Sequence, residues 1–286
     1  MSSVFAGPFS SNLEDQPYEA APSRVTVARE RLQRLARLLL QVARMWIAAR
    51  LRVHRLGPAG RADLVRTSAR TLLDSLRIRV VASGEVPPAN VPVLIVANHV
   101  SWLDSYVVNS LNPARFVAKS EVRDWPIIGT VATRFGTFFL RRGSFRDAAR
   151  TVTRLSAVLR GGYPVAAFPE GTTGSGAGVD RFYPAMFQAA VNAQAMVQPI
   201  AIRYLAADGT RSRRAAFVGD MSVWDSVRLL LEEPELIVEV TCCPLLWPTN
   251  RTRRELATLS RESIATVLSP DRWERPDQPF SQRRAA

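Results

Sequence analysis

The chain has 286 residues and a formal charge of +13 at neutral pH. That charge predicts an anionic partner, either nucleic acid or an anionic lipid surface. No DNA- or RNA-binding module is recognisable, and aromatic side chains do not alternate with the basic ones, so nucleic acid is not the expected partner. The two cysteines, Cys242 and Cys243, are adjacent and far from any histidine, so they predict neither a zinc site nor a disulfide and favour a reducing compartment.

The N-terminal residues 1–25 are rich in serine, proline and acidic side chains. They lack the charged start and apolar core of a signal peptide, so we expect a disordered tail and no export. The segment 269–286 is also polar and rich in proline, and we expect a second loose tail there.

A long amphipathic helix is predicted between Arg31 and Arg55. At about 100° per residue, one arc of this helix is polar and the opposite arc is apolar. The polar arc holds Arg31, Arg34, Arg37, Gln41, Arg44, Arg52 and Arg55, and the apolar arc holds Leu32, Leu35, Leu39, Val42, Ala43 and Trp46. The longest interval between arginines is six residues, whereas a membrane span needs about 20 apolar residues. We therefore expect the helix to lie in the plane of a membrane surface, with packing on the protein's own core as the alternative.

A second helix is predicted from Ala62 to Leu76, so that residues 26–76 form a helical pair at the membrane surface. Beyond it, short apolar runs alternate with helical stretches. Strands are predicted near 77–82, 92–97, 115–118, 136–140, 164–168, 197–204, 214–218 and 236–241, and helices near 103–111, 145–160, 184–194, 223–231 and 251–267. This pattern predicts an α/β domain over residues 77–268, with a mixed, largely parallel sheet flanked by helices.

The segment from Asn98 to Asp104 is the leading candidate for chemistry. His99 follows the apolar run from Val91 to Ala97, so it should emerge where a buried strand ends. On a continuous helix His99 and Asp104 would lie about 140° apart, so they can meet only if the chain turns between them. A strand-to-helix corner supplies that turn. Asp104 would then accept the Nδ1 proton of His99 and leave Nε2 free to take a proton from a hydroxyl.

Three further blocks each combine an apolar run with a polar group able to bind an anion or a hydroxyl. They are Gly136 to Gly143 (GTFFLRRG), Val165 to Thr173 (VAAFPEGTT) and Val197 to Arg203 (VQPIAIR). With N-H-x4-D, the blocks G-x-F-F-x-R-R, F-P-E-G-T and V-x-P-I resemble, in this order, the four motifs of the glycerolipid acyltransferase family, which includes the 1-acylglycerol-3-phosphate acyltransferases. The resemblance covers about residues 77 to 245.

The resemblance implies the glycerolipid acyltransferase fold and transfer of a fatty acyl group to the hydroxyl of a lysolipid. The donor would be a thioester on coenzyme A or on acyl carrier protein. Neither a metal nor a covalent acyl-enzyme is expected. The N-terminal helical pair would steer the acyl chain, and the enzyme would lie on the cytoplasmic face of the cell membrane as a peripheral or monotopic protein in contact with anionic lipids.

The resemblance also assigns roles to single residues. His99 would be the general base and Asp104 its orienting partner. Arg142 would bind a phosphate or another anionic head group, with help from Arg141, and Lys119 would supply further charge to the substrate site. In the third motif, Glu170, Gly171 and Thr172 would shape the acceptor pocket, with the Glu170 carboxylate accepting a hydroxyl proton and Gly171 allowing close backbone approach. Pro199 would fix the pocket wall.

One position departs from the family's pattern. The lysophosphatidate enzymes usually have arginine after E-G-T, whereas this chain has Thr173. The leading expectation is acylation of 1-acyl-sn-glycerol-3-phosphate to phosphatidic acid, and acylation of lyso-ornithine lipid or another lysolipid is the alternative. A lipid-binding protein without catalysis and hydrolysis of the thioester remain open as other classes of function.

Overall fold

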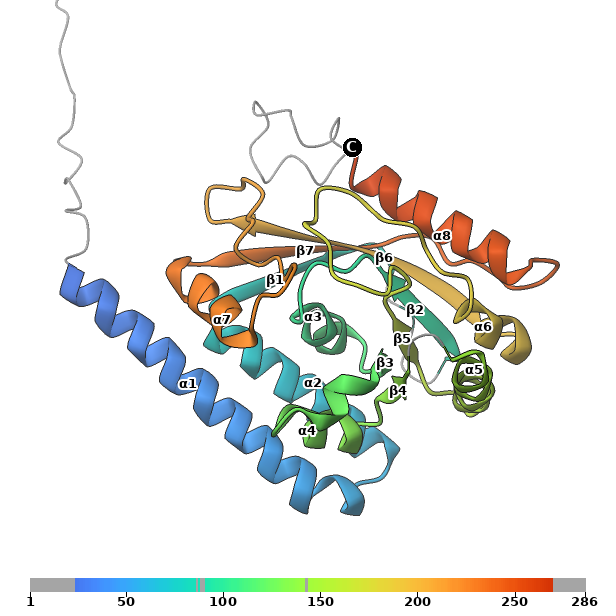
Figure 1. Cartoon of the computed structure of the whole chain (residues 1–286), viewed down its shortest axis with the longest axis horizontal. Coiled ribbons are helices and arrows are strands. Elements are labelled where there is room, and N and C mark those ends of the chain that lie inside the picture. The colour runs from blue at the N-terminus through green and yellow to red at the C-terminus, as the bar shows by residue number, and fades with distance from the viewer. Residues whose placement is uncertain (1–23, 86, 88–90, 142–143, 270–286) are drawn as a thin grey trace, which may run out of the picture.

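The computed structural model describes residues 24–269 apart from 86, 88–90 and 142–143 (Figure 1). The two tails predicted at residues 1–25 and 269–286 lie almost wholly outside the described residues. A seven-stranded sheet has the order β1-β7-β6-β2-β5-β3-β4, in which β6 and β7 are antiparallel and the other neighbours are parallel. Its strands are β1 (Ile78–Ser83), β2 (Val93–Ala97), β3 (Arg115–Lys119), β4 (Phe138–Leu140), β5 (Val165–Ala167), β6 (Met196–Ala206) and β7 (Leu236–Cys242). The mixed, largely parallel sheet predicted from the sequence is confirmed.

Helices cover both faces of the sheet (Figure 1). One face packs against α1 (Arg24–Leu51), α2 (Pro58–Ser75), α3 (Asp104–Leu111), α4 (Ile128–Arg134) and α7 (Val223–Glu232). The other packs against α5 (Phe145–Arg160), α6 (Phe187–Ala193) and α8 (Arg253–Val267). Two short 3-10 helices, η1 (Val53–Arg55) and η2 (Ser120–Asp124), follow α1 and β3.

Strand β2 is apolar throughout because both of its faces are buried. Its side chains alternate between the two cores: Val93, Ile95 and Ala97 join the core under α1–α3, and Leu94 and Val96 join the core under α5, α6 and α8. All five residues are buried because helices cover both faces of the sheet. The chain that leaves β2 therefore emerges from the centre of the sheet at its carboxyl edge.

The prediction of a strand at residues 214–218 is wrong. This segment is a loop in which Ala215 and Ala216 are buried. The main-chain N–H of Phe217 donates to the oxygen of Val100 at 2.9 Å. The apolar run thus packs on the segment after β2 instead of pairing within the sheet. The helices η2 and α4 were not predicted from the sequence. Both are short and follow β3.

The predicted polar arc of the first helix is wrong in part. The side chains of Arg34 and Gln41 face the protein and are only 3% and 6% exposed. From the predicted apolar arc, Leu35, Val42 and Trp46 pack partly against the core. The outer face carries large apolar side chains that are about half exposed or more: Val25, Leu32, Leu39, Leu40, Ile47 and Leu51. The helix is therefore amphipathic in a different sense, with protein on one side and an uncovered apolar stripe on the other.

Arg34 is buried because it satisfies carbonyl groups at two helix ends. Its guanidinium donates to the main-chain oxygens of Leu76, after α2, and of Leu230, Leu231 and Glu233, at the end of α7, over 2.6–3.3 Å. The last carbonyls of a helix lack partners within it and carry partial negative charge, so a cation is favoured there. Burial and the nearby Arg77 lower the pKa of Arg34 from its ordinary value. This residue ties α1 to α2 and α7.

Candidate active site

The carboxyl ends of four neighbouring parallel strands, β2, β5, β3 and β4, meet at one edge of the sheet. His99 follows β2, Glu170 follows β5, Lys119 ends β3 and Arg141 follows β4. Ligands of open α/β sheets bind outside the carboxyl ends of the strands. The topology therefore brings four of the predicted site residues to one edge, in the order in which the strands lie.

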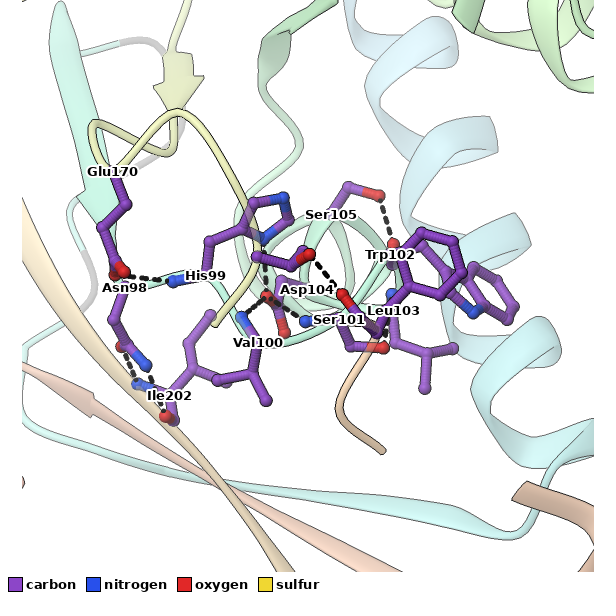
Figure 2. Close-up of polar contacts among 12 residues, drawn as sticks. Asn98, His99, Val100, Ser101, Trp102, Leu103, Asp104, Ser105, Glu170 and Ile202 are labelled. Atoms are coloured by element: carbon purple, nitrogen blue, oxygen red, sulfur yellow. Dashed lines mark hydrogen bonds and ion pairs between the residues drawn. The ribbon is translucent and has the colours of Figure 1, made fainter. Parts of the chain in front are cut away.

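His99 and Asp104 meet across the predicted corner. Nδ1 of His99 lies 2.8 Å from Oδ2 of Asp104, which is the first residue of α3 (Figure 2). Asp104 is fully buried, whereas the His99 side chain is 19% exposed. Figure 2 shows the second ring nitrogen of His99 on the side away from Asp104. The pair thus joins a buried carboxylate to an imidazole that solvent or a substrate can reach.

The Asp104 carboxylate is held by further hydrogen bonds. Its Oδ2 accepts from the main-chain N–H groups of Val100 and Ser101 at 2.7 and 2.9 Å, and its Oδ1 accepts from the hydroxyl of Tyr204 at 2.7 Å. Hydrogen bonds from neutral donors stabilise the charged form of a carboxylate. Burial and the charge of Asp104 raise the pKa of Tyr204 well above its ordinary value, so this hydroxyl remains a donor.

The contacts of Asp104 determine which nitrogen of the His99 ring carries the proton. Because the Asp104 carboxylate accepts, Nδ1 of His99 donates and Nε2 keeps its lone pair. The ring is also stacked on Phe168, with the ring centroids 3.9 Å apart and the planes 4° from parallel. Phe168 precedes Pro169 and Glu170, so the chain after β5 sets the plane of the imidazole. The arrangement is that of an oriented general base.

Glu170 links the chain after β5 to the chain after β2. Its Oε1 accepts from the main-chain N–H of His99 at 3.0 Å, and the residue is only 6% exposed. Burial raises its pKa from the ordinary 4.5 to about 7, although main-chain N–H groups of His99 and Asp180 act in the opposite direction. The main-chain bond holds the Glu170 carboxylate beside His99, and acceptance of a substrate hydroxyl proton by this carboxylate stays a prediction.

Gly171 and Thr172 are exposed beside Glu170. Gly171 has a φ of +72°, a left-handed conformation that favours glycine. An added Cβ would approach nothing closer than the Tyr183 ring at 3.8 Å. The left-handed turn after Glu170 explains the glycine within the protein, and close backbone approach to a substrate at Gly171 stays a prediction.

Thr173 forms a hydrogen bond to the loop at residues 214–218. Its hydroxyl donates to the main-chain oxygen of Phe217, and the next residue, Gly174, donates its N–H to the oxygen of His99 at 2.7 Å. Position 173 thus helps to hold the chain after β5 against two other loops. Sequence reasoning placed Phe168 in a motif but gave it no role, and it did not identify Tyr204 or Phe217 as parts of this site.

The sequence profile described as Acyltransferase matches residues 77–203. A lyso-ornithine lipid O-acyltransferase of Pseudomonas aeruginosa is 35% identical over 208 residues, which are 73% of this chain and 79% of that protein. The chain belongs to the acyltransferase family. A 1-acyl-sn-glycerol-3-phosphate acyltransferase of Neisseria meningitidis is also 32% identical over 215 residues, 75% of this chain and 84% of that protein.

A solved member of the family shares the fold. The crystal structure of PlsC, a 1-acyl-sn-glycerophosphate acyltransferase from Thermotoga maritima, matches with a TM-score of 0.52. The match covers 82% of this chain and 96% of that one. At 18% identity, it concerns the fold alone.

Lys119 and Arg141 lie at the ends of β3 and β4, beside the chain that follows β5. Lys119 pairs with Leu140 between β3 and β4, and both Lys119 and the adjoining Arg141 are exposed. Arg142 lies outside the described residues. Pro199 is buried within β6 opposite Val96 of β2, so it lies in the sheet itself. Among the described residues, no three His, Cys, Asp or Glu side chains are grouped closely enough to hold a metal ion.

Proposed function

We propose that this protein transfers a fatty acyl group from a thioester to the hydroxyl of a lysolipid. The observation that supports it most is the His99–Asp104 pair, with Nε2 open at the carboxyl edge of the sheet. Nε2 takes the proton of the hydroxyl as its oxygen attacks the thioester carbonyl. The tetrahedral intermediate collapses, the carbon–sulfur bond breaks, and the imidazolium returns its proton to the leaving thiolate. Asp104 stabilises the imidazolium throughout.

The proposed acceptor is 1-acyl-sn-glycerol-3-phosphate. Lys119 and Arg141 support it, because cationic side chains at the ends of adjacent strands suit a phosphate. Lyso-ornithine lipid is the second candidate. Thr173 stands where the lysophosphatidate enzymes usually have arginine, and its hydroxyl is engaged with the main-chain oxygen of Phe217. The name of the Pseudomonas relative also favours that acceptor.

The proposed donor is acyl-coenzyme A or acyl carrier protein, each a co-substrate that carries the thioester. The mechanism above uses side chains of the protein and the two substrates, and it needs no further cofactor. The +13 charge is compatible with either carrier, because the phosphates of coenzyme A and the acidic surface of a carrier protein are both anionic.

We also propose that the protein works on the cytoplasmic face of an anionic membrane. The outer face of α1 supports this, with Leu32, Leu39 and Leu51 each more than half exposed. Exposed apolar patches of this kind mark interaction surfaces. Exposed arginines on the same helix would meet anionic head groups. No helix in the described part of the chain is long and apolar enough to cross a bilayer.

The test is acyl transfer by the purified protein, with labelled acyl-coenzyme A and acyl carrier protein as donors. The acceptors are lysophosphatidate, lyso-ornithine lipid and a neutral lysophospholipid. His99→Ala should lower the rate by about 10²–10⁴. His54→Ala, which removes the chain's other histidine, should leave the rate unchanged.

The pattern of products separates the candidates. Product from lysophosphatidate that disappears in His99→Ala supports the first acceptor, and product from lyso-ornithine lipid alone supports the second. Free fatty acid without acylated lipid would indicate thioester hydrolysis. Absence of product from every acceptor, or equal product from His99→Ala, would contradict the proposal.

A further inference from the structure

A second feature of the molecule lies where α1 meets η2 and α4. A cavity of about 320 Å³ opens there. It is lined by Arg50 from α1, Arg123 from η2, and Gly129, Thr130, Thr133 and Arg134 from α4. It shares no lining residue with the active site described above.

The lining is suited to an oxyanion. It brings together three guanidinium groups and two hydroxyls, all of which can donate hydrogen bonds, and it includes no carboxylate. Within the described part of the chain, none of the three arginines forms an ion pair. A second cavity, of about 440 Å³ beside α8, is different: its three arginines share the lining with Glu262, and Arg261 is bound to main-chain oxygens of Val179 and Asp180.

Two of the three guanidiniums are held in position by aromatic rings. Arg50 lies over the ring of Trp46 at 5.0 Å, and Arg123 lies over the ring of Phe139 at 4.8 Å. Stacking uses the face of the guanidinium and leaves its N–H edge available to a ligand. A ligand that binds here therefore meets groups whose side-chain freedom is already restricted.

Gly129 fixes the relation of η2 to α4. A Cβ at this position would lie 1.9 Å from the main-chain oxygen of Arg123, so only glycine allows this approach. The close approach sets Arg123 beside Thr130, Thr133 and Arg134, which all lie on α4. The cavity is thus a property of the backbone packing and not of flexible surface side chains alone.

The surroundings of the cavity are apolar and exposed. On α1, Ile47 and Leu51 flank Arg50 in the sequence and are 49% and 60% exposed. Immediately before α4, Trp125 and Ile127 are 37% and 45% exposed. Arginine among exposed aromatic and aliphatic side chains is the composition of a surface at the level of lipid head groups.

We propose that the cavity between α1 and α4 binds the phosphate of an anionic phospholipid of the bilayer, and so holds this side of the protein against the membrane. The proposal rests on the membrane-surface function proposed above and adds a defined head-group site to it. The lipid bound here is a component of the bilayer and not the acyl acceptor. Its phosphate oxygens would accept hydrogen bonds from the guanidinium N–H groups of Arg50, Arg123 and Arg134.

The experiment measures binding of the full chain to phosphatidylcholine vesicles with and without phosphatidic acid, by flotation at physiological salt and without acyl donor. The triple variant Arg50→Gln, Arg123→Gln and Arg134→Gln should lose about 100-fold in affinity for the anionic vesicles, since each arginine near the surface contributes roughly fivefold. The matched control replaces Arg181, Arg253 and Arg254 by glutamine. These exposed arginines lie by α8, on the other face of the sheet, and the same loss of charge there should change affinity by less than about threefold.

A triple variant with lysine at Arg50, Arg123 and Arg134 distinguishes specific phosphate binding in the cavity from nonspecific electrostatic attraction to the bilayer. It keeps the charge but lacks the planar fork that holds two phosphate oxygens. Binding weaker than that of the parent protein supports the site. Binding equal to that of the parent would show that charge alone acts and would overturn the proposal, as would equal losses in the glutamine triple and its control. Arg134→Gln alone, which removes a guanidinium stacked on no ring in the described chain, gives the same test with about fivefold loss if the triple fails to fold.

A substrate site is distinguished by binding without a bilayer. The glutamine triple should bind coenzyme A and monomeric lysophosphatidate as the parent does. Loss of either would assign the cavity to a substrate and overturn the proposal. Because no turnover is measured, these results do not depend on acyl transfer, and the proposed activity is judged separately by His99→Ala.

Discussion

Asp104 and Arg34 are both buried charges with several hydrogen bonds, yet they serve different ends. Asp104 accepts from two main-chain N–H groups, the Tyr204 hydroxyl and the ring of His99. Arg34 donates to main-chain oxygens alone, at the ends of α2 and α7. A buried charge needs such partners in either case. The two sites differ because Asp104 has a partner that can gain or lose a proton, the His99 ring, whereas the main-chain oxygens around Arg34 cannot.

A buried charge serves chemistry only where one of its partners can exchange a proton with a substrate. Among the partners of Asp104, the His99 imidazole is the one that can exchange a proton with a substrate hydroxyl, and its side chain is partly open to solvent. The partners of Arg34 cannot change charge, so that site can only hold elements together. Substitution of Asp104 should therefore affect turnover most, and substitution of Arg34 should affect stability most.

The largest effect is expected for Asp104→Asn. An amide of the same shape removes the charge that stabilises the imidazolium, and its NH₂ group cannot accept from the donors that surround Asp104. The kcat of acyl transfer should fall by about 10²–10⁴. Asp180→Asn removes an exposed carboxylate near Glu170 and should have little effect. A kcat of Asp104→Asn close to that of the parent would show that His99 works without its partner.

The next largest effect is expected for Arg34→Met. The substitution leaves the carbonyls at the ends of α2 and α7 buried without their donor, so the free energy of unfolding should fall by about 2–4 kcal/mol. Denaturant unfolding measures it. Arg37→Met, on the same helix but exposed, should change the free energy by no more than about 0.5 kcal/mol. Equal losses in the two variants would contradict the role of Arg34.

Glu170 extends the comparison to a buried carboxyl whose hydrogen bonds do not compensate its burial. Because its folded pKa is raised to about 7 from 4.5, its contribution to stability is present below pH 4.5 and is lost as the pH rises through 7. Glu170→Gln has no such titration. The parent should therefore lose about 1–3 kcal/mol relative to the variant between pH 5 and pH 8, as measured by unfolding at each pH. Parallel pH curves for the two proteins would disprove the shift.

The smallest effect is expected for Tyr204→Phe. This change removes one donor to Asp104 and leaves the hydrogen bond with His99 in place. The kcat should therefore fall by about tenfold, near the lower end of the effect of one hydrogen bond to a charged group. The pH profile of kcat should shift too, which a purely structural defect would not cause. Tyr106→Phe removes the hydroxyl of another tyrosine, on α3 itself, and is the control. Equal effects from both substitutions would show that the contact with Asp104 does not matter.

The sequence predicted much of the site because the information is local. His99 and Asp104 are five residues apart, and the apolar run before them locates the end of β2. The partners of this pair are distant in the chain. Tyr204 is 100 positions from Asp104, and Phe168 lies in another motif, so no spacing rule could relate them.

Two errors have the same origin. The run at 214–218 has the composition of a strand, but its partner is the segment at Val100. Arg34 lies on the polar arc of α1, but the ends of α2 and α7 surround it. Periodicity shows which residues share a face of an element, and it cannot show what that face meets.

The α/β class, the positions of most strands and helices, the family and the pair His99 and Asp104 could be predicted from the chain alone, because each is encoded in short stretches of neighbouring residues. Tertiary structure decided the role of Tyr204, the burial of Arg34, the engagement of Thr173 with Phe217, and the arginine-lined cavity between α1 and α4. Each of these joins segments that only folding brings together, and a buried polar group is stable only where such a distant partner completes its hydrogen bonds.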